Sequence, residues 1–196
     1  MLLCNWHANR YEQAYIDPAQ VGAHCATLNT TVNATDGSLR TAFKVDYGKI
    51  PFTIVEEYHP DANHTRGVYV KSVDMPGAKL LTLPTVVVDA QRSQAPARRA
   101  AVTKTTTNHN ANANGNANAN GKAVDSGFYE TAILYSCVEK LGIAVEELVF
   151  MSTNRSLDDA ALAAMEATAK SVGVTWDDSK LNRVDWSDTS GCPHPN

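Results

Sequence analysis

The sequence lacks a hydrophobic run long enough to cross a membrane, and it lacks an excess of positive charge. A membrane-spanning helix needs about 20 predominantly apolar residues, and no stretch of the 196 residues approaches this length. The 17 Lys and Arg residues are outnumbered by 21 Asp and Glu residues, for a formal net charge of -4. A general cationic surface of the kind that nucleic acid selects is therefore not expected. We predict no membrane span and no nucleic-acid partner.

The sequence also has little that is typical of catalysis or metal binding. Its four cysteines include no CxxC pair, and its six histidines show no metal-ligand spacing. An active site would be indicated by a nucleophile beside a base, or by two carboxylates in one cleft. Neither stands out, so we predict no metal site, no required cofactor and no enzymatic activity.

One segment, residues 91–123, differs in composition from everything around it. It contains no acidic residue, and Asn occupies every even position from Asn108 to Asn120. A polar tract without aromatic residues cannot bury enough apolar surface to offset the entropy of ordering it. We predict a disordered, basic insertion within a single domain that spans residues 1–196. The alternative is that this insertion docks an acidic partner.

Alternating apolar and polar residues, rich in β-branched and aromatic side chains, predict eight strands. Six precede the insertion, at residues 10–16, 24–32, 38–47, 51–59, 67–73 and 79–88, and two follow it, at 129–138 and 146–153. Turn-forming residues such as Asp36-Gly37 separate consecutive strands. Eight strands in this order predict an all-β fold, an antiparallel up-and-down barrel whose closure removes the exposed edges.

A helix is predicted after the eighth strand and is expected to pack on the barrel wall. Ser156 is a candidate N-cap, and the helix should run to about Ser171, with Gly173 as a left-handed C-terminal cap. Apolar residues recur at helical spacing and form one stripe: Leu162, Met165, Ala169 and Val172. An extended piece at residues 180–186 should lead to Cys192.

The seventh strand and its surroundings resemble the lipocalin family. The run from Tyr129 to Cys137, Tyr-Glu-Thr-Ala-Ile-Leu-Tyr-Ser-Cys, is followed by an apolar strand, by Leu157 at the start of a helix and by a Cys near the terminus. Arg10-Tyr11-Glu12 also resembles the first strand of the family, especially of its apolipoprotein D-like and bilin-binding branch. The resemblance implies carriage of a small hydrophobic ligand, such as a lipid, retinoid, sterol, bilin or carotenoid.

The residues that close one end of the family's barrel differ in this sequence. The usual tryptophan falls on Arg10, and the arginine that packs across it falls on Thr153. Trp6 and Arg155 lie close to these positions and offer a substitute cation–aromatic pair. The chain therefore resembles a distant member of the family.

Cysteines and glycosylation sequons indicate a secretory history. The resemblance implies disulfides that join Cys25 to Cys192 and Cys4 to Cys137. Four cysteines allow three pairings, and free cysteines are the alternative that the sequence leaves open. Four Asn-x-Ser/Thr sequons begin at Asn29, Asn33, Asn63 and Asn154. We predict a disulfide-bonded glycoprotein in the extracellular space or the secretory lumen. Met1 to Leu3 are too few for a signal peptide, so we expect a mature or truncated N-terminus.

The alternation within strands predicts which residues would line a ligand site. Successive side chains of a strand point to opposite faces, so the apolar set of each strand should point inward. The candidates are Leu28, Thr30, Val32, Leu39, Phe43, Tyr47, Phe52, Tyr58, Ala132 and Leu134. We expect a largely apolar cavity that opens near the turns around Asp36 and Pro60.

Two other functions remain open at this point. If these residues instead form a solid core, the protein would be a filled barrel that acts on partners through its loops and its basic insertion. A pigment-modifying enzyme on the same fold is the other alternative, because Glu12 and Glu130 could lie inside the barrel.

Overall fold

The computed structural model describes residues 8–48, 50–74, 82–92, 129–140 and 142–186, and these contain nine strands. The strands are β1 (Ala8–Ile16), β2 (Ala23–Val32), β3 (Leu39–Tyr47), β4 (Ile50–Pro60), β5 (Val68–Val73), β6 (Leu83–Arg92), β7 (Tyr129–Lys140), β8 (Ile143–Ser152) and the short β9 (Asn182–Arg183). All eight predicted strands are present. The largest shift affects β6, which was predicted at 79–88, partly outside the described residues.

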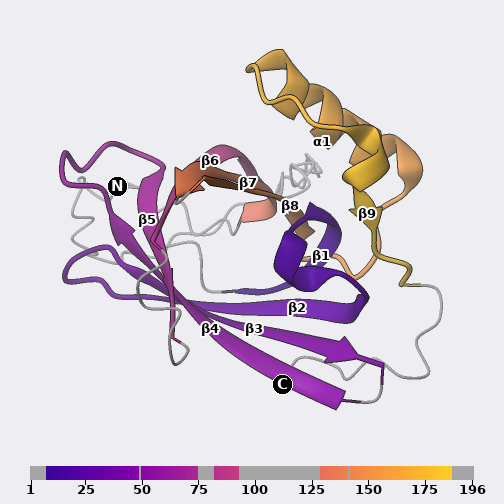
Figure 1. Cartoon of the computed structure of the whole chain (residues 1–196), viewed down its shortest axis with the longest axis horizontal. Coiled ribbons are helices and arrows are strands. Elements are labelled where there is room, and N and C mark those ends of the chain that lie inside the picture. Colours follow the sequence, from indigo (N-terminus) through magenta and orange to yellow (C-terminus); the bar gives the residue numbers. More distant parts are fainter. Residues whose placement is uncertain (1–7, 49, 75–81, 93–128, 141, 187–196) are drawn as a thin grey trace, which may run out of the picture.

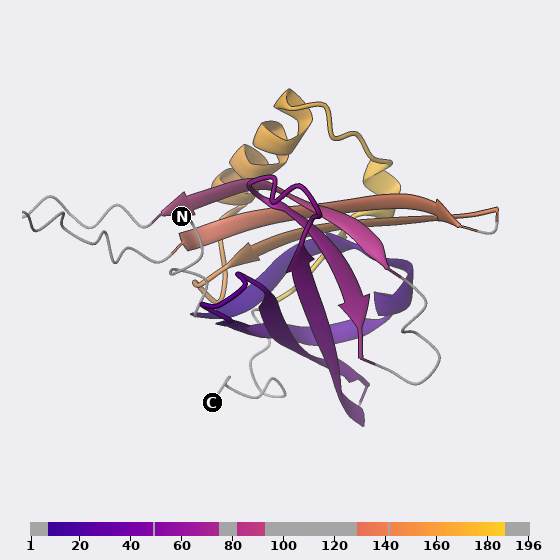
Figure 2. The same cartoon turned by 90° about the vertical axis from the view of Figure 1, so that its left-hand side faces the viewer.

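The strands form a closed antiparallel barrel. Consecutive strands from β2 to β8 are hydrogen-bonded neighbours, and β1 closes the ring because it pairs with both β8 and β2. It divides its length between them: Ala8 to Tyr11 face β2, and Tyr11 to Ile16 face β8. Figures 1 and 2 show the strands curving around a common interior. The predicted barrel is confirmed.

Side chains alternate between the barrel interior and its outer surface, as the sequence pattern indicated. The inner apolar cluster includes Leu28, Leu39, Phe43, Val45 and Tyr58, each nearly inaccessible to solvent. The predicted inward sets of β2, β3 and β7 therefore lie where they were expected. This cluster forms the wall of the candidate site.

Helix α1 (Asp159–Ser171) covers the outer face of β1, β7 and β8; Figures 1 and 2 both place it outside the barrel. Ile133, Leu148 and Phe150 point outward yet have no exposed surface, because the apolar stripe of α1 packs over them. Val172 was predicted to belong to this stripe but is 62% exposed. It follows the last helical turn as the C-cap residue, so it points away from the wall.

The helix begins later than predicted. Asp158, and not Ser156, is the N-cap, and its carboxylate accepts a hydrogen bond from the Ala161 amide at 2.7 Å. The reason lies in the preceding residue: the Leu157 amide donates to Gln13 Oε1 at 2.9 Å, which ties Leu157 to β1 before the helix starts. Gly173 has a φ of +92°, as expected of a left-handed C-terminal residue.

The insertion also begins later than predicted. Gln91 pairs with Thr131 and Arg92 with Tyr129, so both residues complete β6 instead of opening a loop. Residues 93–128 lie outside the described part of the chain, and the prediction of disorder there stays a prediction.

The barrel wall contains a cation–aromatic pair, but with a different partner from the one expected. The guanidinium carbon of Arg155 lies 5.5 Å from the ring centroid of Trp186, whereas Trp6 is outside the described residues. The Trp186 indole also donates to the Glu12 carbonyl at 2.8 Å. Residues 180–186, predicted to be extended, contain β9, which pairs with Ala14 and Tyr15 of β1.

The cysteine predictions have different outcomes. Cys137 is exposed and free, so the expected link from Cys4 to Cys137 is wrong in this structure. An outward position on β7 explains the exposure, because no described element covers that end of the strand. Cys4 and Cys192 are outside the described residues, and the link between Cys25 and Cys192 stays a prediction.

Candidate functional site

Most residues predicted to line a ligand site surround two small cavities inside the barrel. Leu28, Tyr58 and Leu134 line both cavities, Phe43 lines the central one, and Thr30 and Leu39 line the second. Ala132 is buried in the inner cluster, and Val32 and Tyr47 pack against it. Phe52 is 40% exposed and meets Tyr47 edge to face at 6.5 Å, so it lies at the rim of the barrel and not inside.

The cavities are small. The space open to the centres of water-sized atoms is about 20 Å³ in the central cavity and about 10 Å³ in the second. A buried water needs roughly 10–15 Å³ on this measure, so the central cavity holds about one water molecule. The two cavities share four lining residues, Leu28, Tyr58, Leu134 and Met151. A larger space can therefore form only if these side chains move.

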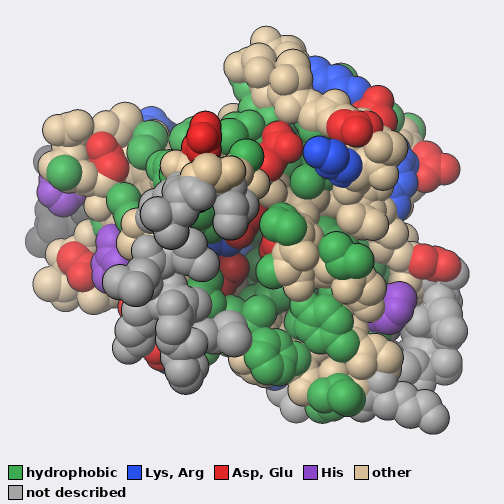
Figure 3. All heavy atoms as spheres, in the orientation of Figure 1, with side chains coloured by type: hydrophobic (Ala, Val, Ile, Leu, Met, Phe, Trp, Pro, Cys, Tyr) green, Lys and Arg blue, Asp and Glu red, His purple; other side chains and the backbone are tan. Residues whose placement is uncertain are grey.

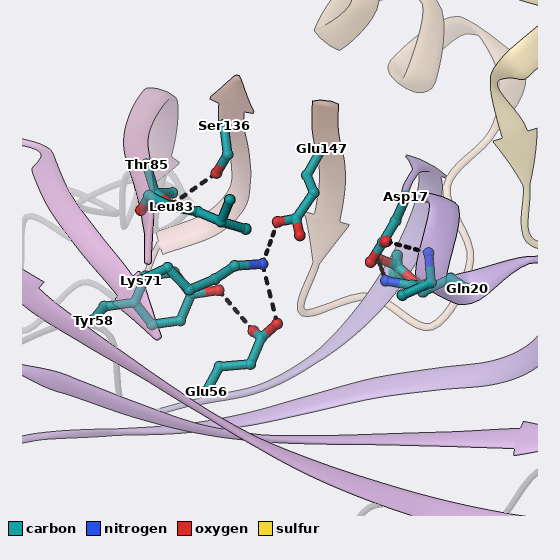
Figure 4. Close-up of polar contacts among 11 residues, drawn as sticks. Asp17, Gln20, Glu56, Tyr58, Lys71, Leu83, Thr85, Ser136 and Glu147 are labelled. Atoms are coloured by element: carbon teal, nitrogen blue, oxygen red, sulfur yellow. Dashed lines mark hydrogen bonds and ion pairs between the residues drawn. The ribbon is translucent and has the colours of Figure 1, made fainter. Parts of the chain in front are cut away.

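A buried ammonium group lies at the centre of the charged part of the site (Figure 4). Lys71 Nζ lies 3.3 Å from Glu56 Oε1 and also donates to Glu147 Oε2. The Tyr58 hydroxyl donates to the other oxygen of Glu56 at 2.7 Å. Lys71 is only 5% exposed, so this ion-paired cluster lies in the barrel interior and not on its surface.

The neighbouring strands β4 and β5 and the more distant β8 supply these charges, and alternation explains how they meet. Glu56 shares the inner face of β4 with Tyr58, Lys71 follows Tyr69 on the inner face of β5, and Glu147 precedes Val149 on β8. Each charged residue lies two positions from an inward apolar neighbour, and side chains of a strand repeat their direction every two residues. The barrel therefore brings all three to one point.

A second polar pair, Glu12 and Gln20, approaches the cavity from β1 and from the short 3-10 turn η2 (Pro18–Gln20). Asp17 caps this turn by accepting a hydrogen bond from the Ala19 amide at 2.7 Å, and the Tyr47 hydroxyl donates to the Ala19 carbonyl at 2.7 Å. The Tyr15 hydroxyl donates to the Gln20 carbonyl at 3.0 Å. The turn is thus held against the barrel mouth, with the Gln20 side chain inside.

Two acceptor atoms of this pair are unsatisfied. Gln20 Nε2 donates to Glu12 Oε1 at 3.4 Å. Glu12 Oε2 and Gln20 Oε1 are buried and have no hydrogen-bond partner among the described residues. Buried acceptors without donors are unusual in folded proteins, so the Glu12–Gln20 pair is the part of the site that most needs a further partner.

Burial sets the protonation of the site. It raises the pKa of Glu12 well above its usual value; the carboxylates of Asp17 and Glu56 add to this, and the Gln20 hydrogen bond and Lys71 oppose it. Burial also raises the pKa of Glu147, against the opposing effect of Lys71. Burial alone would lower the pKa of Lys71, but Glu56 and Glu147 outweigh it and raise that pKa. Lys71 is therefore charged, and Glu12 keeps its proton at pH values at which an exposed carboxyl group has already lost it.

The prediction of a largely apolar cavity is therefore wrong for the central cavity. Four carboxyl groups and one ammonium group line it: Glu12, Asp17, Glu56, Glu147 and Lys71. Sequence reasoning placed Glu12 inside but missed the others, because it assigned the interior to the apolar members of each strand. The signal was present in the same alternation, which pairs Glu56 with Tyr58. Glu130, the other candidate interior acid, instead accepts a hydrogen bond from Asn154 at 2.8 Å and lines neither of these cavities.

The central cavity also lies toward the opposite end of the barrel from the one expected. Asp17 and Gln20 belong to the connection between β1 and β2, whereas the turns around Asp36 and Pro60 are at the other end. Val21 and Ile50, at the same end as the cavity, are 75% and 69% exposed. Near the centre of the face in Figure 3, charged side chains lie beside hydrophobic ones. We therefore place the mouth at the β1–β2 end.

The predicted glycosylation sites lie in different environments. Asn33 and Asn63 are exposed in the turns after β2 and β4. Asn29 is half-buried, and its amide donates to Asn9 Oδ1 at 2.7 Å; Asn154 is exposed. Glycosylation of all four stays a prediction.

Comparison with known proteins identifies the fold. No protein-family model matches the sequence, and no curated protein sequence matches it. Lobster apocrustacyanin A1 is similar in structure, with 14% identity, 94% of this chain and 79% of that chain covered, and a TM-score of 0.57. Insecticyanin from the tobacco hornworm Manduca sexta is similar with 15% identity, coverage of 98% and 84%, and a TM-score of 0.58. A bovine odorant-binding protein is similar with 10% identity, coverage of 97% of this chain and 99% of that chain, and a TM-score of 0.53.

The chain thus has the lipocalin fold, as its resemblance implied. Among the described residues, no helix has the length and apolar character to cross a membrane. The same residues contain no group of three or more His, Cys, Asp or Glu side chains placed to hold a metal ion.

Proposed function

We propose that the protein binds one small molecule, apolar over most of its length, inside the barrel, and carries it in the extracellular space or secretory lumen. The supporting observation is the arrangement of the two cavities: the apolar one and the charged one share a wall of four side chains. A guest that spans both would keep an apolar body against Leu39 and Val87 and a polar end near Glu12. Lipids, retinoids, sterols, bilins and carotenoids with such an end all remain candidates.

Solved structures with the same fold support binding as the activity. Their descriptions include an odorant-binding protein, a siderocalin with dual ligand specificities and a possum milk whey lipocalin with bound 4-ethylphenol. These structures are described by what they bind, so we propose carriage and not catalysis. The predicted disulfide between Cys25 and Cys192 and the four predicted glycosylation sequons are consistent with a secreted carrier.

Binding requires the shared wall to move. Leu134 and Met151 separate the two cavities, and neither makes a polar contact that would fix it. Met is flexible and adapts to irregular gaps, so Met151 is the side chain that we expect to shift first. The guest then replaces contacts that these residues make with each other.

The test is a fluorescence titration with retinol, which is neutral and largely apolar. Wild type should bind it, and Leu134→Arg should not, because the longer side chain fills the space between the two cavities that the guest needs. Tyr135→Arg, one residue along β7 and on the outer face, is the matched control and should bind as wild type does. Leu134→Phe narrows the same space without a charge and should weaken binding even if Leu134→Arg fails to fold.

The small cavities also favour a second candidate, a filled barrel that acts on other proteins. The same titration separates the two. If folded wild type binds neither retinol nor any member of a panel of neutral, cationic and anionic ligands, the carrier proposal is wrong and the filled barrel remains.

A further inference from the structure

We propose that the polar end of the guest is a protonated amine, held by Glu12 and Gln20 in the central cavity. The proposal rests on the proposed function, since it names the chemistry that the same site selects. It begins from the two buried acceptors, Glu12 Oε2 and Gln20 Oε1, that have no donor among the described residues.

An alkylammonium group supplies what these atoms lack. It carries three N–H donors and no acceptor, and the pair presents two acceptor oxygens in one cavity once Glu12 has given up its proton. A carboxylate guest would bring only more acceptors, and the single proton of Glu12 is the one donor that these two atoms could offer it. A hydroxyl has one donor and would satisfy one of the two.

The charge of the cavity favours the same guest. Four carboxyl groups and one ammonium group line it; even with Glu12 protonated the carboxylates outnumber the ammonium group, and Lys71 is already engaged by Glu56 and Glu147. An anionic guest would thus find a cation whose charge is already compensated by two carboxylates. A cationic guest would find an excess of negative groups in an interior where electrostatic interactions are stronger than in water.

Size and geometry favour a small head group over its nearest competitors. The cavity admits about one water-sized group, with space of about 20 Å³, and a primary ammonium group is of that size. A guanidinium or a phosphate is wider and would need more of the wall to move. A divalent metal ion would need several converging ligands, and the described residues contain no group of three or more that could hold one.

Binding should release a proton. Glu12 keeps its proton above the usual carboxyl range because burial raises its pKa, and a neighbouring cation would stabilise the ionised form and lower that pKa. The other titratable groups around it are Tyr15 of β1, Asp17 beside the η2 turn, Tyr47 of β3, Glu56 and Tyr58 of β4, Lys71 of β5 and Glu147 of β8. When the ammonium binds, the O–H bond of Glu12 breaks and the proton passes to the buffer. Affinity should therefore rise with pH until the amine itself loses its charge.

Calorimetry with octylamine, octanol and octanoate tests the proposal, because these share one chain and differ only at the head. Wild type should bind octylamine at least tenfold more tightly than octanol and should bind octanoate least. The octylamine affinity should increase from pH 6 to pH 8, with proton release that appears as a dependence of the heat on the buffer. Glu12→Gln should abolish the preference for octylamine over octanol while it keeps octanol binding.

Two further variants make the result specific to the pair. Gln20→Leu removes the second acceptor and should reduce the preference severalfold. Glu57→Gln is the matched control: Glu57 lies on the outer face of β4, 3.7 Å from Arg40, and its loss should leave the preference unchanged. Circular dichroism confirms that each variant is folded.

The outcomes separate this inference from the proposed function. Equal binding of octylamine and octanol, or a preference that survives Glu12→Gln, overturns the amine assignment and leaves retinol binding intact. Retinol binding without any octylamine binding does the same. If neither retinol nor any octyl compound binds, the carrier function fails and the amine site fails with it.

Discussion

At the scale of single residues, the barrel interior is characterised by the protonation of two side chains, Glu12 and Lys71. Glu12 is fully buried with a raised pKa, and Lys71 stays charged because Glu56 and Glu147 face it. A buried ion pair is weak grounds for stability, since the cost of removing both charges from water offsets their attraction. We therefore interpret this cluster as part of a binding site and not as a device that stabilises the barrel.

The raised pKa of Glu12 makes stability depend on pH. Its folded-state pKa exceeds the unfolded value of about 4.3, so the folded state holds the proton at pH values where the unfolded chain has released it. The free energy of unfolding should then fall as pH rises above about 4.3, and the raised pKa of Glu147 acts in the same direction. The slope from one such group is about 1.4 kcal/mol per pH unit until its folded pKa is reached.

Glu12→Gln tests this dependence because glutamine has nearly the same shape and does not titrate. The variant and wild type should be similarly stable near pH 4, and the variant should be the more stable at pH 8. Urea unfolding followed by tryptophan fluorescence measures both. Glu57→Gln should track wild type across the whole range, and a parallel decline in all three proteins would show that Glu12 does not cause it.

The sequence predicted the direction of a side chain correctly where the residue was apolar, like its inward neighbours two positions away. The inward positions of Leu28, Phe43 and Leu134 followed from the period of two. Lys71 and Glu147 obey the same period, but a charged side chain on an inner face contradicts the expectation that apolar residues face the core. Only the barrel geometry, which places β5 opposite β8, reveals that their charges compensate each other.

At the scale of elements, the strands were predictable to within a few residues, and their irregularities were not. Bulges shift the register between Glu12 and Ala14 in β1, between His24 and Thr27 in β2, and between Val87 and Asp89 in β6. A bulge inserts one residue and reverses the faces beyond it, and alternation alone gives no sign of it. In the same way, the side chain of Ile133 was correctly predicted to point outward, but only the position of α1 shows that it is buried.

The N-cap of α1 offers a prediction at this scale. Asp158→Ala removes the 2.7 Å hydrogen bond from the Ala161 amide and a negative charge at the helix N-terminus, and it should cost about 1 kcal/mol of unfolding free energy. Ser156→Ala is the matched control. Its hydroxyl contacts only the Leu157 carbonyl, at 3.5 Å, so the change should stay within about 0.5 kcal/mol. Thermal unfolding of both variants decides which residue caps the helix, and the reverse order would favour Ser156.

At the scale of the whole molecule, the register of β6 and β7 predicts how much chain the barrel needs between them. Arg92 and Tyr129 are direct partners, so a short turn can replace residues 93–128. We expect this deletion to keep cooperative unfolding, with a free energy changed by only about 0.6 kcal/mol per halving of the loop length.

A longer deletion provides the control. Removal of residues 91–128 also takes Gln91 and Arg92 from the ladder and should lower the thermal midpoint relative to the shorter deletion. Chemical denaturation monitored by circular dichroism compares the two. Loss of a single cooperative transition in the shorter deletion would show that the segment contributes to the fold.

The double pairing of β1 also determines when the barrel can form during synthesis. The half of β1 that pairs with β2 finds its partner about 20 residues along the chain, between Thr27 and Thr30, whereas Tyr11 to Ile16 must wait for Leu148 to Ser152. Translation proceeds from the N-terminus, so a nascent chain exposes one edge of β1 until the eighth strand has left the ribosome. Topologies dominated by such distant contacts fold in roughly milliseconds to seconds. Until β8 pairs with it, the exposed edge of β1 is the surface on which a chaperone, or a neighbouring nascent chain, can add a strand.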